Sequence, residues 1–402
     1  MIEYMQALQI VMGKAGWPGA PERIPLREAY GRILAEDARA REDMPPFDKA
    51  AMDGFAVRAA DLAHVPVTLE VVGEVAAGQS CARTLEPGQA AQVMTGAPVP
   101  DGADAVVQVE WTNGFDRATV TVERAVRRGE HVSPRGELAR AEATLVAAGT
   151  RILEEEVALL AAAGLDPCSV ARALTVAVLS TGDELVPPDE TPGPSQIRNS
   201  NGPALVAFLR GVGAIPVDLG RVADDETSIA SALERGLEHD SVIVTGGVSA
   251  GAYDFVRDVL PRLGVEVHFD KLAVKPGRPT VFGTRGRKMI FGLPGNPVSA
   301  LVMARVLVQP AFEKRMGLAR PGPRRARARL ACAIDKKPDR LWFVHGVLDT
   351  GEPLSVAPVE SRGSADLPAA TRGNCLIVAP RGESRVEAGE QVDVLVWARS
   401  VG

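Results

Sequence analysis

The segment Val242-Ile-Val-Thr-Gly-Gly-Val-Ser-Ala-Gly-Ala-Tyr-Asp254 decides the fold, because an apolar β-branched run leads directly into glycines, hydroxyls and a carboxylate. It predicts a buried strand that ends in an anion-binding loop. Gly246, Gly247 and Gly251 permit positive φ angles and a close approach of backbone N–H groups to a phosphate. The next segment, 255–263, can supply a helix N-terminus. A glycine-rich turn can also be an ordinary chain reversal, so other segments must support this interpretation.

Three further segments show an apolar strand that ends in polar or turn-forming residues. They are residues 174–185, 214–222 and 288–297. Helical patterns follow the second of them, through Leu237, and the third, from 298 to about 316. Strands and helices that alternate at this spacing predict βαβ units with right-handed crossovers and a mostly parallel sheet. Ligands bind at the carboxyl ends of such strands, which all lie on one side.

Several charged residues should therefore face one crevice together with the glycine loop. The carboxylates are Glu184, Asp225 and Asp254, and the cations come from the segment 274–280, at Lys275 and Arg278. Carboxylates crowded together repel one another unless a cation lies among them. A set of carboxylates beside two basic side chains suits a complex of Mg²⁺ and phosphate. The sequence thus predicts a site for a metal-bound phosphate compound.

Each of these residues also has a simpler interpretation. Asp224 or Asp225 can act only as the N-cap of the following helix, which is the more common role for a single Asp at that position. Lys275 and Arg278 can be solvated loop charges, and Glu184 can form an ordinary salt bridge. The functional interpretation rests on all of them occurring at one sheet edge.

Composition limits the class of protein. The chain has 402 residues, of which 46% are apolar and 24% are charged, so it is globular and long enough for two to four domains. A net charge of −6 argues against a general nucleic-acid surface. The basic run 320–329 is interpreted as a solvated linker. The cysteines are too widely spaced for a CxxC motif and are expected to be reduced thiols; they are Cys81, Cys168, Cys332 and Cys375.

No targeting or membrane-spanning segment is expected. The N-terminal residues show the pattern of an amphipathic helix and lack the basic start and apolar core of a signal peptide. The longest apolar stretch, 297–312, is interrupted by Arg305 and is too short to span a bilayer. We therefore expect a cytoplasmic protein without membrane contact.

The patterns along the chain predict a multidomain α/β protein. Residues 1–40, with a second helix near 26–38, and residues 140–171 form a discontinuous helical linker domain. Residues 41–139 form an inserted β-rich module. The βαβ domain spans 172–318, and 319–402 form a C-terminal β domain.

The inserted module has two polar loops of its own. Asp48 and Asp53 lie around a glycine turn at Gly54, and Thr95 precedes Gly96. Turn chemistry explains Asp-Gly and Thr-Gly pairs well. It does not explain why both loops occur in a chain that also carries the predicted crevice.

Six segments together resemble the MoeA family of molybdopterin molybdenumtransferases, to which the E domain of gephyrin is related. The match covers nearly the whole chain in the family's order. The segments are Phe47-Asp-Lys-Ala-Ala-Met-Asp-Gly-Phe-Ala56, Met94-Thr-Gly-Ala-Pro98, Ser180-Thr-Gly-Asp-Glu-Leu185, Thr245-Gly-Gly-Val-Ser-Ala-Gly251, Val274-Lys-Pro-Gly-Arg-Pro279 and Gly292-Leu-Pro-Gly-Asn-Pro-Val-Ser299. The resemblance implies a molybdopterin-binding βαβ domain, a C-terminal domain like a β-barrel and an elongated homodimer.

The reaction that the resemblance implies converts adenylylated molybdopterin and molybdate into the molybdenum cofactor and AMP, with Mg²⁺ as cofactor. The implied catalytic residues are Asp53, Thr95, Glu184, Asp225 and Asp254, of which Glu184, Asp225 and Asp254 hold the metal. The implied substrate-binding residues are Thr181, Gly246, Gly247, Ser249, Gly251, Lys275, Pro276, Arg278, Asn296, Ser299, His345 and Ser364.

Family dimers build the site from two subunits, so the resemblance implies that Asp53 and Thr95 complete the crevice of the partner chain. It also implies a molybdopterin adenylyltransferase and molybdoenzyme maturation proteins as partners. Two alternatives stay open: the βαβ domain also resembles molybdopterin adenylyltransferases, and a non-enzymatic scaffold or cofactor carrier has the same motifs. The sequence does not distinguish molybdate from tungstate.

The chain departs from the family at several positions. His345 occupies the place of an Arg taken to contact molybdate, whereas Ser364 is retained. Arg278 stands where Lys is frequent, His131 where Asp is frequent, and Lys49 follows Asp48 in place of Asn. If His345 contacts the oxyanion, binding should strengthen as the pH falls from about 8 to 6. The alternative is a strand residue without ligand contact.

Overall fold

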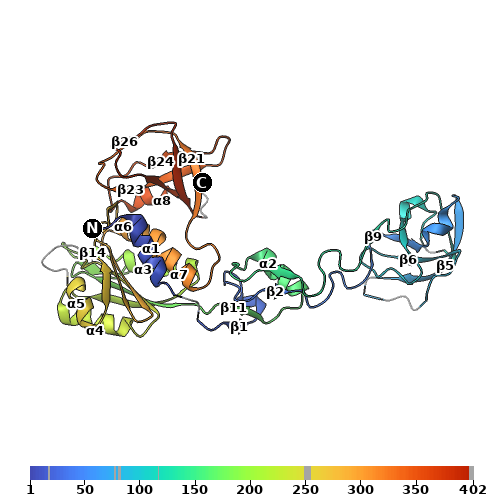
Figure 1. The fold of residues 1–402 in the computed structure, drawn as a ribbon, viewed down its shortest axis with the longest axis horizontal. Coiled ribbons are helices and arrows are strands. Elements are labelled where there is room, and N and C mark those ends of the chain that lie inside the picture. The colour runs from blue at the N-terminus through green and yellow to red at the C-terminus, as the bar shows by residue number, and fades with distance from the viewer. Residues whose placement is uncertain (17–18, 77, 80–82, 116, 249–254, 398–402) are drawn as a thin grey trace.

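The computed structural model describes residues 1–16, 19–76, 78–79, 83–115, 117–248 and 255–397. The molecule is elongated (Figure 1). One end holds the N-terminal helix together with the segments coloured green-yellow to red, and a β-rich module in light blue and cyan forms the other end. A slender middle region connects the two ends.

The larger end is built around a six-stranded sheet of order β15-β12-β16-β20-β19-β17. The first four strands are parallel. At one edge, β19 pairs antiparallel with β20, and β17 pairs antiparallel with β19. The bounds are β12 (Thr175–Thr181), β15 (Ile215–Val222), β16 (Ser241–Thr245), β17 (Glu266–Phe269), β19 (Val281–Arg285) and β20 (Lys288–Leu293). This confirms the prediction of a mostly parallel βαβ sheet.

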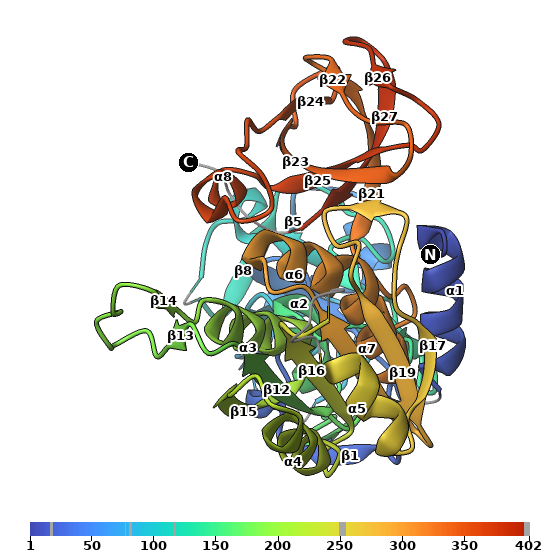
Figure 2. The same ribbon diagram turned by 90° about the vertical axis from the view of Figure 1, so that its left-hand side faces the viewer.

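Successive residues of a strand point to opposite faces of the sheet, and here the side chains on both faces are apolar. Helices therefore cover both faces. Val176 and Val178 pack with α3, α6 and α7 on one face, whereas Ala177 and Leu179 pack with α4 and α5 on the other. Figure 2 shows these helices around the strands. The bounds are α3 (Asn201–Val212), α4 (Glu226–Gly236), α5 (Val256–Arg262), α6 (Pro297–Met303) and α7 (Gln309–Arg315), with the π-helical turn η4 (Ala304–Val308) between α6 and α7.

The predicted amphipathic helix at the N-terminus is confirmed as α1 (Tyr4–Lys14). Its buried residues join the same core as α6 and α7. The Tyr4 hydroxyl donates to the Val306 carbonyl at 3.3 Å. The Tyr4 ring also lies edge-on to Phe343, with 5.1 Å between the ring centroids. The helix therefore docks where the sheet domain meets the C-terminal domain.

The middle region contains fewer helical residues than predicted. Its helices are α2 (Glu154–Ala162) and the short 3₁₀ turn η1 (Leu26–Glu28), and its strand pairs are β1 (Glu22–Ile24) with β11 (Cys168–Val170) and β2 (Ala38–Arg39) with β10 (Thr144–Val146). The predicted helix near 26–38 is wrong. Gly31 adopts a φ of 77°, and the backbone of Ile33 and Leu34 bonds to Ala171 and Thr150 instead of to its own turn. Tertiary pairing thus overrides the local helix propensity.

The inserted module consists mainly of a five-stranded sheet of order β7-β4-β6-β5-β8. Its strands are β4 (Gly54–Val57), β5 (Val67–Val75), β6 (Gln89–Val93), β7 (Ala105–Gln108) and β8 (Thr119–Val122), and a separate pair joins β3 (Lys49–Ala50) to β9 (Val132–Ser133). These strands agree with the prediction of a β-rich module. Strand β7 ends at Gln108, where the 3₁₀ turn η3 (Val109–Trp111) begins.

The C-terminal domain is a closed barrel. Its sheet has the order β18-β23-β24-β21-β27-β25, and an additional pairing of β23 with β25 closes it. The strands are β18 (Val274–Lys275), β21 (Arg324–Leu330), β23 (Leu341–Asp349), β24 (Ser355–Pro358), β25 (Cys375–Ala379) and β27 (Gln391–Val396). The interpretation of 320–329 as a solvated linker is wrong from Arg324 onward, because β21 buries Ala328 and Leu330 while its arginines stay exposed.

Cys168, Cys332 and Cys375 are free thiols, as predicted, and Cys81 lies outside the described residues. In the part of the chain that the structure describes, no helix has the length and apolar character needed to cross a membrane.

A buried ion pair fastens the middle region to the sheet domain. Arg151 precedes α2 and donates through Nη2 to Glu313 Oε1 of α7 at 3.0 Å. The Glu313 side chain is only 6% exposed. Its other oxygen accepts the Gly322 N–H, and Arg151 also donates to the Gly31 carbonyl. Arg151 Nη1 also donates to the Val212 carbonyl of α3 at 3.4 Å, so the contacts with Glu313 and Val212 hold the slender region against the larger end.

Replacement of Arg151 by Ala should lower the free energy of unfolding by about 3 kcal/mol, because it leaves the Glu313 carboxylate buried without its cation. The double variant Arg151→Met/Glu313→Leu buries no charge and should recover part of that loss. Urea unfolding followed by circular dichroism measures both. Equal losses in the two variants would show that the contacts of Arg151 to backbone carbonyls, and not the ion pair, stabilise this junction.

Candidate functional site

The carboxyl ends of three parallel strands meet at one edge of the central sheet. In register, Ser180 lies opposite Thr245, and Thr245 lies opposite Leu293. Gly246 and Gly247 follow with φ angles of 87° and 60°. A Cβ at Gly246 would lie 2.5 Å from the Thr181 carbonyl oxygen, so a side chain cannot fit there. The predicted glycine loop is thus packed directly against the end of β12.

Part of this loop lies outside the described residues. The predicted residues Ser249, Gly251 and Asp254 fall in the segment 249–254. Their predicted roles remain predictions.

Three buried polar atoms at this edge form no hydrogen bond of good geometry among the described residues, although the Thr181 hydroxyl lies close to the Asp224 carboxylate. They are Thr181 Oγ1, Asp224 Oδ1 and Asn201 Oδ1. Such atoms are rare in folded proteins, because an unpaired buried polar group costs free energy. Asn201 begins α3 and donates through Nδ2 to the Gly295 carbonyl at 2.7 Å, which places it beside the loop after β20. The three atoms mark a place where a ligand or ion can supply the missing partners.

Asp224 is the inward-facing carboxylate of the pair at the start of α4. Burial raises its pKa, the charges of Asp183 and Glu184 raise it further, and the nearby Thr181 hydroxyl lowers it. Its N–H donates to Asp183 Oδ1 at 3.2 Å. Three acidic side chains thus lie close enough to repel one another, and a cation would relieve this repulsion.

Asp225, which was predicted to bind metal, serves in the structure as the N-cap of α4. Its Oδ1 accepts the Ser228 N–H at 2.9 Å, and hydrogen bonds from Ser228 lower the pKa of its exposed carboxyl. Sequence reasoning therefore chose the wrong member of the Asp pair as the inward one. The signal was present, because an Asp directly before the first helical residue, Glu226, is in the capping position. Asp224 then remains beside the sheet edge.

Glu184 lies in the turn that follows β12. Gly182 adopts a φ of 148°, and a Cβ there would lie 2.7 Å from Glu184 Oε2. The carboxylate therefore folds back over the strand end toward Asp224. The next residues form the strand pair β13 (Leu185–Val186) and β14 (Ile197–Arg198), which projects from the domain (Figure 2).

A second group of predicted residues gathers around the start of α6. Asn296 precedes the helix and donates through Nδ2 to Ser364 Oγ at 2.8 Å. The Val298 N–H donates to the Ser364 carbonyl. Ser299 lies in the first turn and is buried. Since Ser364 follows β24 of the barrel, Asn296 and Ser364 meet only because the barrel packs on the sheet domain.

The segment with Lys275, Pro276 and Arg278 connects the two domains. β18 pairs with β23, and Lys275 Nζ lies 3.7 Å from the centroid of the Trp342 ring. Burial lowers the pKa of Lys275, and nearby cations lower it further. A Cβ at Gly277 would clash with Met303 of α6, so the backbone is held tightly beside that helix. Lys275 and Arg278 both remain exposed at this boundary.

His345 lies in β23, and the pKa of its imidazole is lowered to about 4, first by burial and then by the charge of Arg305. Its ring is edge-on to Trp397, and Arg305 stacks on the same indole at 4.2 Å. The imidazole is therefore neutral between pH 6 and 8. The expectation that His345 protonation strengthens oxyanion binding over that range is wrong, because the environment disfavours the charged form.

Asp53 and Thr95 form a tight pair in the β-rich module. The Thr95 N–H and hydroxyl both donate to Asp53 Oδ1, at 2.6 and 2.7 Å, and these bonds lower the pKa of the Asp53 carboxyl. The module lies at the opposite end of the molecule from the central sheet (Figure 1). Within one chain, the pair is therefore remote from the carboxyl edge.

Comparison with known proteins gives matches along nearly the whole chain. Residues 2–164 match the MoeA N-terminal region (domain I and II), residues 177–314 a probable molybdopterin binding domain, and residues 327–397 the MoeA C-terminal region (domain IV).

Relatives of similar length share about a third of the residues. A protein from Bacillus subtilis named molybdopterin molybdenumtransferase is 34% identical over 94% of this chain and 90% of its own length. One from Mycobacterium tuberculosis, named molybdopterin molybdenumtransferase 1, is 35% identical over 94% of this chain and 95% of its own. Two solved structures titled molybdopterin biosynthesis MoeA protein from Pyrococcus horikoshii have TM-scores of 0.83 and 0.85. They share 32% and 28% identity and cover 98% and 99% of this chain and 99% and 100% of their own.

The buried neutral imidazole of His345 makes stability depend on pH. Its folded-state pKa of about 4 lies below the ordinary value of 6.5, so the unfolded chain binds the proton more readily between these values. The free energy of unfolding should fall as the pH drops from about 6.5 to 4, by at most about 3 kcal/mol. His345→Gln cannot take up this proton and should lose less. Urea unfolding at several pH values compares the two, and parallel curves would contradict the assignment.

Proposed function

Since the chain belongs to the MoeA family, we propose that it converts adenylylated molybdopterin and molybdate into the molybdenum cofactor and AMP. The observation that carries this proposal is the set of unpartnered buried atoms, Thr181 Oγ1, Asn201 Oδ1 and Asp224 Oδ1, at the sheet edge that also holds the glycine loop. Ligands of parallel α/β sheets bind at this edge.

The glycine loop and the domain boundary suit the phosphate groups of such a substrate. Gly246 and Gly247 let the backbone approach a phosphate closely, since no Cβ intervenes. Lys275 and Arg278 supply positive charge from the boundary with the barrel. Asn296 and Ser364 offer polar atoms for an oxyanion beside α6. A neutral His345 carries no positive charge with which to bind an oxyanion.

Mg²⁺ is the proposed cofactor, and the residues at the sheet edge fit it. Asp224 has an unpartnered oxygen and lies beside Asp183 and Glu184, so negative charge is in excess at this edge. Hard cations such as Mg²⁺ take oxygen ligands. Among the described residues, no three acidic, His or Cys side chains already stand in a metal-binding arrangement. We place Asp224 and Glu184, together with Asp254, in the ligand role and leave Asp225 as a helix cap. The bound ion would neutralise charge on the pyrophosphate as its bond breaks.

The remote position of Asp53 and Thr95 supports a site shared by two subunits. In a homodimer, the β-rich module of one protomer would bring this pair to the sheet edge of the other. A preformed, ionised Asp53 that is already held by Thr95 suits such a role, since it needs no rearrangement on docking.

The proposed function also suggests partners and a compartment. A molybdopterin adenylyltransferase would deliver the substrate, and maturation proteins of molybdoenzymes would receive the product. The free thiols at Cys168, Cys332 and Cys375 are in keeping with the cytoplasm.

Asp224→Asn should reduce Mg²⁺-dependent AMP release at least about 100-fold, a loss of the size seen when one preorganised electrostatic group is removed from a reaction centre. Asp225→Ser keeps a capping oxygen for the Ser228 N–H and should stay active. Asp225→Ala should mainly lower the unfolding temperature. AMP release measured by chromatography, with thermal unfolding of each variant, distinguishes the two aspartates. An inactive Asp225→Ser beside an active Asp224→Asn would reverse our assignment.

Mixing two inactive variants tests the shared site. Asp53→Ala and Asp254→Ala chains should each lack activity, yet a mixture should regain part of it, since a heterodimer contains one site with both aspartates intact. Exchange of subunits is followed with differently tagged chains. A mixture that exchanges and stays inactive would mean that the site does not combine residues from two chains.

A further inference from the structure

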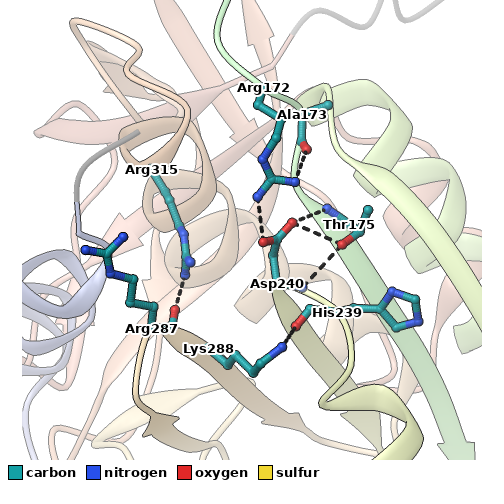
Figure 3. Close-up of polar contacts among 8 residues, drawn as sticks. All are labelled: Arg172, Ala173, Thr175, His239, Asp240, Arg287, Lys288 and Arg315. Atoms are coloured by element: carbon teal, nitrogen blue, oxygen red, sulfur yellow. Dashed lines mark hydrogen bonds and ion pairs between the residues drawn. The ribbon is translucent and has the colours of Figure 1, made fainter. Parts of the chain in front are cut away.

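A basic cluster lies at the amino edge of the central sheet, opposite the candidate site. We define the amino-edge cluster as Arg172, Asp240, Arg287, Lys288 and Arg315. Arg172 precedes β12, Asp240 precedes β16, Arg287 and Lys288 lie where β20 begins, and Arg315 ends α7. Figure 3 shows Arg172 and Arg315 beside Asp240, with the guanidinium of Arg287 on the other side of Arg315, whereas Lys288 extends toward the His239 carbonyl.

The single carboxylate of the cluster is already fully bonded. Asp240 Oδ1 accepts Arg172 Nη2 at 2.6 Å, and Oδ2 accepts the Thr175 N–H and hydroxyl at 2.8 and 3.0 Å. Although burial opposes it, these bonds lower the pKa of the Asp240 carboxyl. Asp240 is therefore ionised, and its charge is largely offset by Arg172. Its two oxygens therefore have little capacity left to accept hydrogen bonds from the other cations.

Arg287 and Arg315 remain as neighbouring cations. Arg315 donates through Nη1 to the carbonyl of Arg287, and Figure 3 shows its guanidinium between Arg287 and Asp240. Burial lowers the pKa of Arg315, the charge of Asp240 raises it, and the charges of Arg172 and Arg287 lower it. The Arg287 side chain has no hydrogen bond or ion pair within the described ranges. The positive charges of Arg287 and Arg315 are thus held close together, and burial partly desolvates the Arg315 guanidinium.

Other groups nearby do not balance this charge. Lys288 donates through Nζ to the His239 carbonyl at 2.8 Å, which uses no acidic partner. Glu22 acts on Arg172 but is itself paired with Arg32. Lys288 also lines a hollow that contains Glu234 and Glu238. Three guanidinium groups, those of Arg172, Arg287 and Arg315, therefore remain around one occupied carboxylate. Placing like charges together costs free energy unless a counter-charge is bound.

We propose that the amino-edge cluster is a binding site for a small tetrahedral oxyanion, held by Arg287 and Arg315 with support from Arg172. Guanidinium groups match the geometry of such anions, because their fork donates two parallel N–H bonds. A small anion suits this arrangement, since the guanidinium groups of Arg172 and Arg287 lie on either side of Arg315. A bound anion would tie the beginnings of β12, β16 and β20, whose other ends carry the candidate site. The inference does not depend on the proposed reaction.

Thermal unfolding of the full chain tests the site. Sodium sulfate at about 20 mM is compared with sodium chloride of equal ionic strength, so that general screening is the same in both. The wild type should gain about 2–4 °C in sulfate, as expected for an anion at several times its Kd. Arg287→Ala should abolish the gain and lower sulfate affinity at least about tenfold in calorimetric titration. Arg315→Lys, which keeps the charge but not the fork, should weaken binding less.

Arg285 provides the matched control. It lies two residues before Arg287 and lines a hollow with Glu234, Glu238 and Lys288. It is not among the groups that shift the pKa of Arg315. Arg285→Ala should keep the full sulfate effect. Titrations with phosphate and molybdate show whether the site takes oxyanions in general or the one that the reaction consumes. No sulfate-specific gain in the wild type, or an equal loss in Arg285→Ala and Arg287→Ala, would overturn the proposal.

Discussion

The close approach of Gly246 to the backbone of Thr181 is the constraint on which the rest of the site depends. It requires that β12 and β16 end at the same level, which their parallel register ensures. Because β20 joins in the same register, the loop that carries Gly295 also reaches this edge, where Asn201 holds its carbonyl. A side chain at Gly246 would push these loops apart. The register and the missing Cβ together therefore create the place where unpartnered polar atoms collect.

Much of this arrangement follows from sequence because its signals are local. Apolar β-branched runs that alternate with helical patterns permit only a few topologies, and the right-handed crossover rule places all four strand ends on one side. The strand ends at Thr181, Thr245 and Leu293 were predictable for this reason.

Structural features that depend on tertiary contacts could not be predicted from one sequence. The segment 26–38 has good helix formers, but its backbone pairs with Thr150 and Ala171, more than a hundred residues away. Arginines alternate along β21 because the barrel buries only the small residues between them. His345 is neutral because of its position against Trp397 and Arg305, which lie on other elements. In each case long-range packing decides the outcome that local composition left open.

The two edges of the sheet differ in charge, and the chain trace explains why. Strands enter from the amino edge after short connections that carry Arg172, Asp240 and Arg287, and they leave into loops that carry Asp183, Glu184 and Asp224. Carboxylates therefore collect where a cation and a phosphate compound are proposed to bind, and guanidinium groups collect at the opposite edge. Strands β12, β16 and β20 run between the two edges and hold the groups at each edge in fixed positions. A counter-ion bound at either edge would reduce the repulsion among the like charges there. Each excess of charge is tolerated because the buried sheet between them keeps the two sets apart.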